Sequence, residues 1–186
     1  MRKLYVVRHG EIDFNTEERY AGSVDVELNN KGLEQTYDIA KEISKLNIDL
    51  IITSPLKRCN DMANIIHKII NTPIIKMSEF SERNVGVFEG LTREEAKNKY
   101  PKLWVKNITR VYNDAPTGGE TIREVESRVF SGLKKIKKKY SDKNILVITH
   151  GFASKVIHKF FNTTITEEDF FKYKLNNANI KEYNFY

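Results

Sequence analysis

Three short apolar runs, far apart in the chain, most constrain its fold. They are Lys3–Val7, Asp49–Thr53 and Asn144–Thr149, each rich in Val, Ile or Leu and bounded by charged or polar residues. Continuous apolar runs of about 4–8 residues are typical of strands that are covered on both faces of a parallel sheet. Such strands need long crossover connections, which are usually helices.

Helical patterns lie between and after these runs. The residues at helical spacing are Leu33, Tyr37, Ala40 and Ile43; Arg58, Met62, Ile65, Ile66 and Ile69; Ile122, Val125, Val129, Leu133, Ile136 and Tyr140; and Phe152, Val156, Ile157 and Phe160. Thr92 with Glu95, and Thr121 with Glu124, fit capping boxes at helix starts. The tail, Asn176–Tyr186, is predicted to be a last edge strand. The alternation predicts an α/β fold with a mainly parallel sheet covered on both faces, in one domain over residues 1–186.

Charge and cysteine content narrow the classes of partner. The net charge of +6 favours anionic partners, but much of the excess lies in Lys134–Tyr140 (KKIKKKY), which is typical of a solvated helix face. No nucleic-acid module accompanies it, so we expect no DNA or RNA partner. The single Cys59 can form neither an internal disulfide nor a zinc knuckle, and nowhere do about 18 apolar residues run together. We expect a cytoplasmic protein without a membrane segment; no oligomeric state follows from the sequence.

The residues that follow the three predicted strands carry the chemistry. Arg8-His9-Gly10 follows the first, Ser54–Arg58 (SPLKR) follows the second, and His150-Gly151 follows the third. Ligands of such sheets bind outside the carboxyl ends of the strands. Two His and two Arg are therefore expected to meet there.

Two arginines beside an imidazole indicate phosphoryl chemistry. Guanidinium forks suit phosphate oxygens, and an imidazole nitrogen among such donors can attack phosphorus directly. Ser54 is predicted to cap a helix whose first residue is Pro55, which would place Arg58 near the free N–H groups of the first turn. The site is thus expected to take a phosphorylated ligand.

A histidine that accepts a phosphoryl group also needs an acid for the leaving alkoxide and a base for water. The polar stretch Met77–Gly90 offers Glu79, Glu82 and Glu89, and spacing alone does not choose among them. The alternative is a metal site built from the two His with Glu11 or Asp13. The usual short His spacings are missing, however, and the neighbouring arginines would repel a cation. The remaining His67 and His158 are interpreted as ordinary helix residues.

The ordered motifs resemble those of the histidine phosphatase superfamily, the family of the cofactor-dependent phosphoglycerate mutases. The series is RHGE at Arg8–Glu11 with Asn15 behind it, YAGSVDVELNNKGLEQ, SPLKR, SERNVGVFEGLT, PTGGET and VITHG. It covers the chain from Tyr5 to about Phe161. RHG alone is a weak signal, whereas RHG, SPLKR, E-x-x-x-G-x-x-E-G and THG in this order and spacing are highly specific.

The resemblance implies a three-layer sandwich of the phosphoglycerate mutase type, with no metal and no other cofactor. It implies that His9 becomes a phosphohistidine, and that Glu82 is the general acid and later the base toward water. The implied phosphate pocket consists of Arg8, Arg58 and His150, with Asn15 as a further contact and Gly22 and Gly151 as loop glycines at its edge.

Three positions depart from the family's common motifs. Ile12 stands where threonine is usual and Phe14 where tryptophan is usual, so any hydroxyl contact made at the first position in relatives is absent. Cys59 occupies a slot that alanine usually takes. Its thiol is either oxidisable beside the pocket or buried and inert.

Water is the predicted acceptor of the phosphoryl group. Only a short segment separates the Glu82 motif from PTGGET, without the basic cluster that mutases of the family carry there. The motifs look most like those of α-ribazole phosphatases and broad-specificity bacterial relatives, which implies a small phosphorylated metabolite, α-ribazole 5'-phosphate being one candidate. Phosphoglycerate mutase, metal hydrolase and non-catalytic phospho-ligand binding protein remain alternatives. The segment Lys97–Ala115 is predicted to roof the pocket, where Tyr100 or Trp104 either stacks on a ring or packs in the core.

Overall fold

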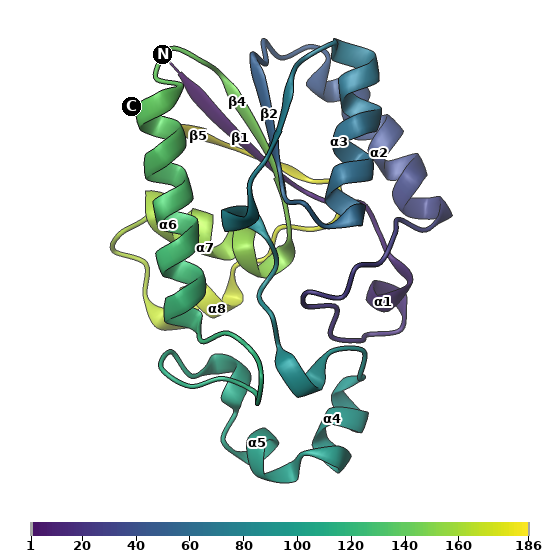
Figure 1. Cartoon of the computed structure of the whole chain (residues 1–186), viewed down its shortest axis with the longest axis vertical. Helices are drawn as coiled ribbons and strands as arrows, with labels where there is room; N and C mark the ends of the chain where they lie inside the picture. The colour runs from purple at the N-terminus through teal and green to yellow at the C-terminus, as the bar shows by residue number, and fades with distance from the viewer. Residues whose placement is uncertain (1, 186) are drawn as a thin grey trace.

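The computed structural model describes residues 2–185 and contains a five-stranded sheet in the order β3-β2-β4-β1-β5 (Figure 1). The strands are β1 (Lys3–Arg8), β2 (Leu50–Thr53), β3 (Ile74–Lys76), β4 (Ile145–Thr149) and β5 (Ile180–Asn184). Four of them are parallel, and β5 pairs antiparallel with β1 at one edge. The three strands predicted from apolar runs and the edge strand predicted in the tail are confirmed. Met1 and Tyr186, the ends of the predicted domain, lie outside the described residues.

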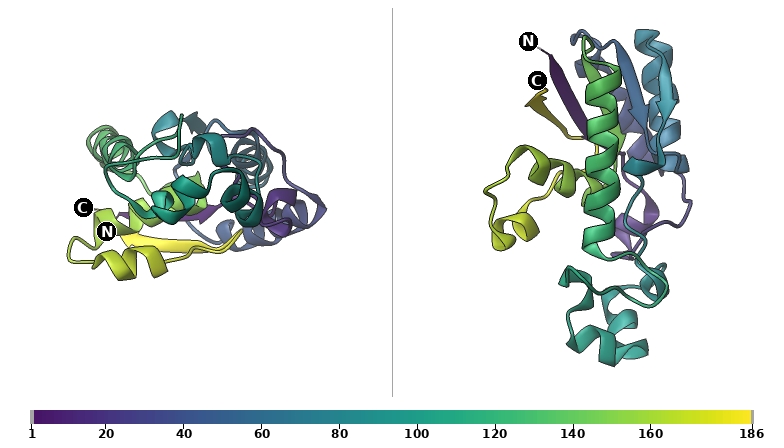
Figure 2. Two further views of the ribbon diagram at one scale, coloured as in Figure 1. Left: turned by 90° about the horizontal axis from the view of Figure 1, so that it is seen from below. Right: turned by 60° about the vertical axis from the view of Figure 1, so that its left-hand side comes forward.

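Helices cover both faces of this sheet, which makes the predicted three-layer arrangement (Figures 1 and 2). The helices are α1 (Asp13–Thr16), α2 (Asn30–Ile43), α3 (Lys57–Ile70), α4 (Arg93–Lys99), α5 (Pro101–Val105), α6 (Ile122–Lys139), α7 (Gly151–Phe161) and α8 (Glu167–Lys172), with short 3₁₀ turns at Ser78–Phe80, Gly86–Phe88 and Ile108–Arg110. α2 and α3 pack on one face, and α6 and α7 pack on the other.

The central strand β4 shows why the apolar runs are continuous. Ile145 and Val147 belong to the core that faces α6 and α7, whereas Leu146 and Ile148 belong to the core that faces α2 and α3. Successive side chains point to opposite faces of a strand, and here both faces are covered. Every residue of β4 is therefore buried.

The buried face of α2 differs from the predicted apolar stripe. Leu33 and Tyr37 are 37% and 53% exposed. The buried positions include Gly32 and Thr36, because the backbone of Gly32 packs directly on that of Gly10 and Glu11 and leaves no room for a side chain. Gly32 thus faces inward at the start of α2 while Leu33 and Tyr37 turn outward, whereas Ala40 and Ile43 of the predicted stripe are buried.

Other helix predictions have mixed outcomes. The capping boxes at Thr92 and Thr121 are confirmed, each with reciprocal hydrogen bonds to a glutamate three residues on. Ile69, predicted to be buried in α3, is 46% exposed near the end of that helix. The edge strand β3 was not predicted, because three residues are too few for a pattern.

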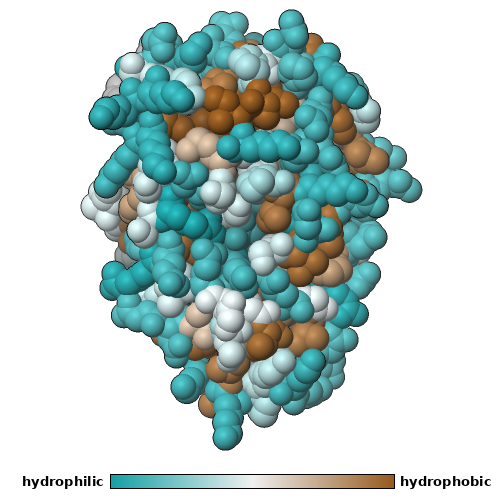
Figure 3. All heavy atoms as spheres, in the orientation of Figure 1, coloured by the Kyte–Doolittle hydropathy of each residue, from teal (hydrophilic) through white to brown (hydrophobic). Residues whose placement is uncertain are grey.

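The segment between β3 and α6 forms the lower part of the molecule, beyond the carboxyl ends of the parallel strands (Figures 1 and 2). It carries α4 and α5 around a small apolar cluster of Val85, Phe88, Ala96 and Ile108. Hydrophilic atoms dominate the face shown in Figure 3, and apolar side chains there form separate patches. In residues 2–185 no helix is both long and apolar enough to cross a bilayer.

Candidate active site

The two His-Gly pairs meet because β1 and β4 are neighbours in register. Arg8 pairs with Thr149, so the next residues, His9 and His150, leave adjacent strands at the same level. The backbone N–H of His9 donates to the carbonyl of Thr149 at 3.0 Å, and the two imidazole centroids lie 5.1 Å apart, edge to face. The structure thus brings together the two histidines that the sequence singled out.

His9 is buried, with 3% of its surface exposed, and its Nδ1 lies 2.7 Å from the carbonyl oxygen of Gly10. A carbonyl can only accept, so Nδ1 carries the proton and Nε2 keeps a free lone pair in the neutral ring. Burial, then the charges of Arg58 and Arg8, hold the pKa of His9 well below its usual range. The ring is therefore neutral at pH 7, with a nucleophilic nitrogen at Nε2.

His150 is fully buried and is held at both ring nitrogens. Nε of Arg58 donates to its Nδ1 at 3.2 Å, so its Nε2 carries the proton and donates to Oγ of Ser54 at 2.8 Å. Burial and the charge of Arg58 hold the pKa of His150 well below its usual range. Both of its ring nitrogens are thus engaged within the protein.

Arg58 is the largest fully buried side chain among residues 2–185 and links His150 to the loop before α2. Its Nη1 donates to the carbonyl of Val24 at 2.7 Å, and its Nη2 donates to the carbonyl of Gly22 at 2.8 Å. A guanidinium has five N–H groups, of which these contacts and the one to His150 use three. Two N–H groups remain available for a ligand oxygen.

The predicted cap of this helix is wrong. α3 begins at Lys57, its N-cap residue is Leu56, and no side chain caps it. Leu56 has extended backbone angles, so Pro55 lies outside the helix and Arg58 is its second residue. The Ser54 hydroxyl instead accepts hydrogen bonds from His150 and from the N–H of Leu56.

Arg8 projects from the end of β1 into the same region. Its Nη1 donates to the carbonyl of Leu175 at 3.1 Å, while its buried Nε has no partner in residues 2–185. A buried donor without a partner is costly, so an anion oxygen at this position would be stabilised. Gly151 lies beside this guanidinium; it is the first residue of α7 and not the loop glycine that was expected.

The three candidate carboxylates have different partners in the structure, and only one of them lies beside the arginines of the site. Glu82 accepts from the backbone N–H groups of Phe152 at 3.1 Å and Ala153 at 3.2 Å, in the first turn of α7, which fixes its carboxylate beside Arg8. Glu79 instead pairs with Lys135 on the surface of α6. Glu89 accepts from the N–H and hydroxyl of Ser23 and from the N–H of Val85, and it holds the Gly22 loop.

A cleft of about 380 Å³ reaches Arg8 and Glu82, while the buried His9, Arg58 and His150 are not among its lining residues. Its lining includes the predicted Asn15 and Gly22, and its charged members are Arg8, Arg19, Arg83, Arg93, Arg110, Lys155 and Glu82. Burial and the nearby Arg110 lower the pKa of Lys155 to about 8. Six basic groups against one acid make this cleft suited to anions.

Three contributors to the site were not found in the sequence. The Asn177 amide Nδ2 donates to the carbonyls of His9 and Gly10 and to Oδ1 of Asn15. Arg83 is buried, and its Nη2 has no partner in the described part of the chain. Lys155 lies at an ordinary helix position. No sequence signal marks them, because each acts through contacts with distant segments.

The unusual motif positions are accommodated in the core. Ile12 is fully buried, and Phe14 packs against the same cluster as α2 and α3. Cys59 is fully buried with its Sγ 3.4 Å from Nε2 of His150. Burial raises the pKa of this thiol, and a thiol that stays protonated reacts poorly. Of the two predictions for Cys59, the structure therefore favours a buried, inert cysteine.

Residues 2–185 contain no group of three or more His, Cys, Asp or Glu side chains arranged to hold a metal ion.

Comparison with known proteins identifies the family. The model of the histidine phosphatase superfamily (branch 1) matches residues 4–186. Uncharacterized phosphatase PhoE of Bacillus subtilis (strain 168) is 34% identical over 153 residues, covering 82% of this chain and 74% of that protein. Phosphoserine phosphatase 1 of Hydrogenobacter thermophilus is 32% identical over 150 residues, covering 81% of this chain and 71% of that protein.

Solved structures agree on the fold. The α-ribazole phosphatase of Shigella flexneri superposes with a TM-score of 0.85 at 19% identity, over 97% of this chain and 89% of that one. The chain therefore belongs to the histidine phosphatase superfamily. It is a phosphatase of that superfamily.

Proposed function

We propose that this protein hydrolyses a small phosphomonoester through a phosphohistidine at His9, without a metal ion. The observation that carries the proposal is the hydrogen bond from Nδ1 of His9 to Gly10, which leaves Nε2 unprotonated within a buried, basic pocket. A neutral imidazole that is already desolvated is a ready nucleophile for phosphorus.

In the first step, Nε2 of His9 bonds to phosphorus as the bond to the ester oxygen breaks. The unpaired Nε–H of Arg8 and the two remaining N–H groups of Arg58 stabilise the charge on the phosphoryl oxygens. Glu82, in its protonated form, gives its proton to the departing alkoxide. The products of this step are the free alcohol and phosphohistidine.

In the second step, Glu82 takes a proton from water, whose oxygen attacks the phosphohistidine. The N–P bond breaks, inorganic phosphate leaves, and Nε2 of His9 regains its lone pair. We assign His150 a positioning role, because it holds Nε of Arg58 and packs against the ring of His9. Asn15 and Gly22 line the cleft through which the ester enters.

The test is release of inorganic phosphate from a panel of phosphomonoesters, with a chelator present, by wild type and His9→Ala. The panel contains α-ribazole 5'-phosphate, phosphoserine, phosphoglycerates, sugar phosphates and an aryl phosphate. We expect chelator-resistant release by wild type and none by His9→Ala. Full activity of His9→Ala would contradict the proposal, and loss of activity with chelator would favour a metal hydrolase.

Folded wild type that releases no phosphate would favour one of the two other candidates. A phosphoglycerate isomerisation assay then separates a mutase from a binding protein without turnover. We propose a cytoplasmic location and α-ribazole 5'-phosphate as one candidate substrate on the motifs described above. The fastest ester of the panel tests that choice.

A further inference from the structure

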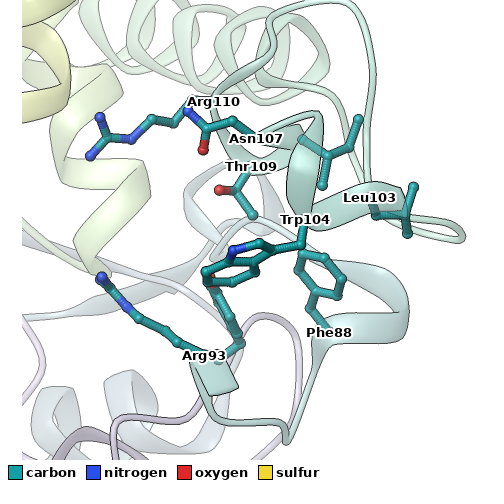
Figure 4. A pocket seen from close by; sticks show the side chains of 9 residues that line it. Phe88, Arg93, Leu103, Trp104, Asn107, Thr109 and Arg110 are labelled. Atoms are coloured by element: carbon teal, nitrogen blue, oxygen red, sulfur yellow. The ribbon is translucent and has the colours of Figure 1, made fainter. Parts of the chain in front are cut away.

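A second hollow, of about 480 Å³, adjoins the reaction cleft in the lower part of the molecule (Figure 4). Tyr20, Arg93, Thr109 and Arg110 line both spaces, so the two share one wall. The volume lies within the range of about 300–1,000 Å³ usual for small-molecule sites. A substrate whose phosphate lies at His9 can extend into this hollow with its alcohol part.

The far side of the hollow is aromatic and aliphatic. Trp104 of α5 lies at its centre, with Phe88 and Leu103 beside it. Trp104 packs against the small apolar cluster of this region but remains partly exposed toward the hollow. The packing role considered for this residue is therefore observed, and the exposed part of the indole leaves room for the stacking role.

The margins of the hollow are cationic. Figure 4 shows the side chains of Arg93 and Arg110 extending in the same direction past the Trp104 indole. No ion pair involving either arginine is present in residues 2–185. Guanidinium groups stack on planar π systems and repel cations. These margins therefore favour a neutral or anionic ring and disfavour a cationic one.

We propose that this hollow is a leaving-group subsite for a planar aromatic or heteroaromatic ring, which stacks on Trp104 between Arg93 and Arg110. The inference rests on the proposed function, since it names the class of alcohol released by hydrolysis. It makes the preferred substrate a phosphomonoester that carries a ring a few bonds away from the phosphate.

The subsite can be observed without turnover, because Trp104 is the only tryptophan of the chain. The probes are two non-hydrolysable phosphonates, 2-(4-nitrophenyl)ethylphosphonate and ethylphosphonate, followed by tryptophan fluorescence and by calorimetry. We expect the nitrophenyl probe to quench the fluorescence and to bind about 10-fold more tightly than the ethyl probe, which should not quench. Inorganic phosphate should displace both.

Kinetics with the corresponding phosphate esters then measure the contribution of the indole. The two alcohols are similar in basicity, so the chemistry is matched and only the ring differs. Trp104→Ala should lower the ratio of kcat/KM for the nitrophenylethyl ester to that for the ethyl ester by about 10-fold. Trp104→Phe should retain part of the preference. Val105→Ala is the control, since Val105 is the next residue of α5 and is 84% exposed.

The outcomes separate this inference from the proposed function. Equal binding of both phosphonates without quenching would overturn the subsite and leave the phosphate site intact. Binding of neither phosphonate would overturn both. An unchanged ratio in Trp104→Ala would likewise refute the stacking role, whatever the absolute rate.

Discussion

The buried pair of His9 and His150 predicts a specific loss of stability in mild acid. Both imidazoles are neutral in the folded protein, and their pKa values lie well below 6.5. In the unfolded chain each histidine titrates near 6.5. Below that pH the unfolded state binds more protons than the folded state. The contribution of these two residues to the free energy of unfolding is therefore fully present above pH 6.5, and it is lost as the pH drops toward the folded pKa values.

The size of the effect follows from the number of groups. Each buried histidine that stays neutral contributes a loss of about 1.4 kcal/mol between pH 7.5 and pH 5.5, the range over which its unfolded counterpart takes up a proton. His9 and His150 are 3% and 0% exposed, so solvent screening does not reduce this contribution much. Between pH 7.5 and pH 5.5 the free energy of unfolding should therefore fall by about 3 kcal/mol through these two residues.

The assay is urea unfolding at the two pH values in a buffer without phosphate, for wild type and for the double variant His9→Asn/His150→Asn. The double variant should lose most of the pH dependence and keep the smaller part due to His158, whose pKa burial also lowers. NMR titration of the four histidine rings provides a check that does not need the variant to fold. Two rings that titrate near pH 6.5 at His9 and His150 would refute the reasoning.

Further predictions concern the proposed catalytic groups. Glu82→Gln should slow hydrolysis strongly and let phosphohistidine accumulate with aryl esters, whose leaving group needs little protonation. Because the N–P bond is labile in acid, mass spectrometry of enzyme quenched in alkaline denaturant would show it. Arg58→Ala should cost about 2–4 kcal/mol in kcat/KM, as for loss of one preorganised donor, and an unchanged rate would remove Arg58 from the pocket. Ser54→Ala leaves the buried Nε2–H of His150 without its acceptor and should lower stability by about 1–3 kcal/mol, measured by thermal unfolding.

Much of the fold could be predicted because its signals are local. A short apolar run such as Asn144–Thr149 is best buried as a strand covered on both faces. Thr121 with Glu124 marks the start of a helix within four residues. The failures share a different cause. The inward face of α2 depends on the contact of Gly32 with Gly10, and β3 exists through its pairing with β2.

The sequence by itself determined which chemistry is possible. His-Gly pairs after strands, arginines at the same edge and carboxylates in one polar stretch indicate phosphoryl transfer, because residue types and strand polarity are readable along the chain. Only the tertiary structure decided which groups face one another. It placed Glu82, and not Glu79, beside Arg8, and it brought Asn177 to His9 from a distant segment. It also assigned the protons of both imidazoles, since a tautomer depends on partners such as Gly10 and Ser54 that only packing supplies.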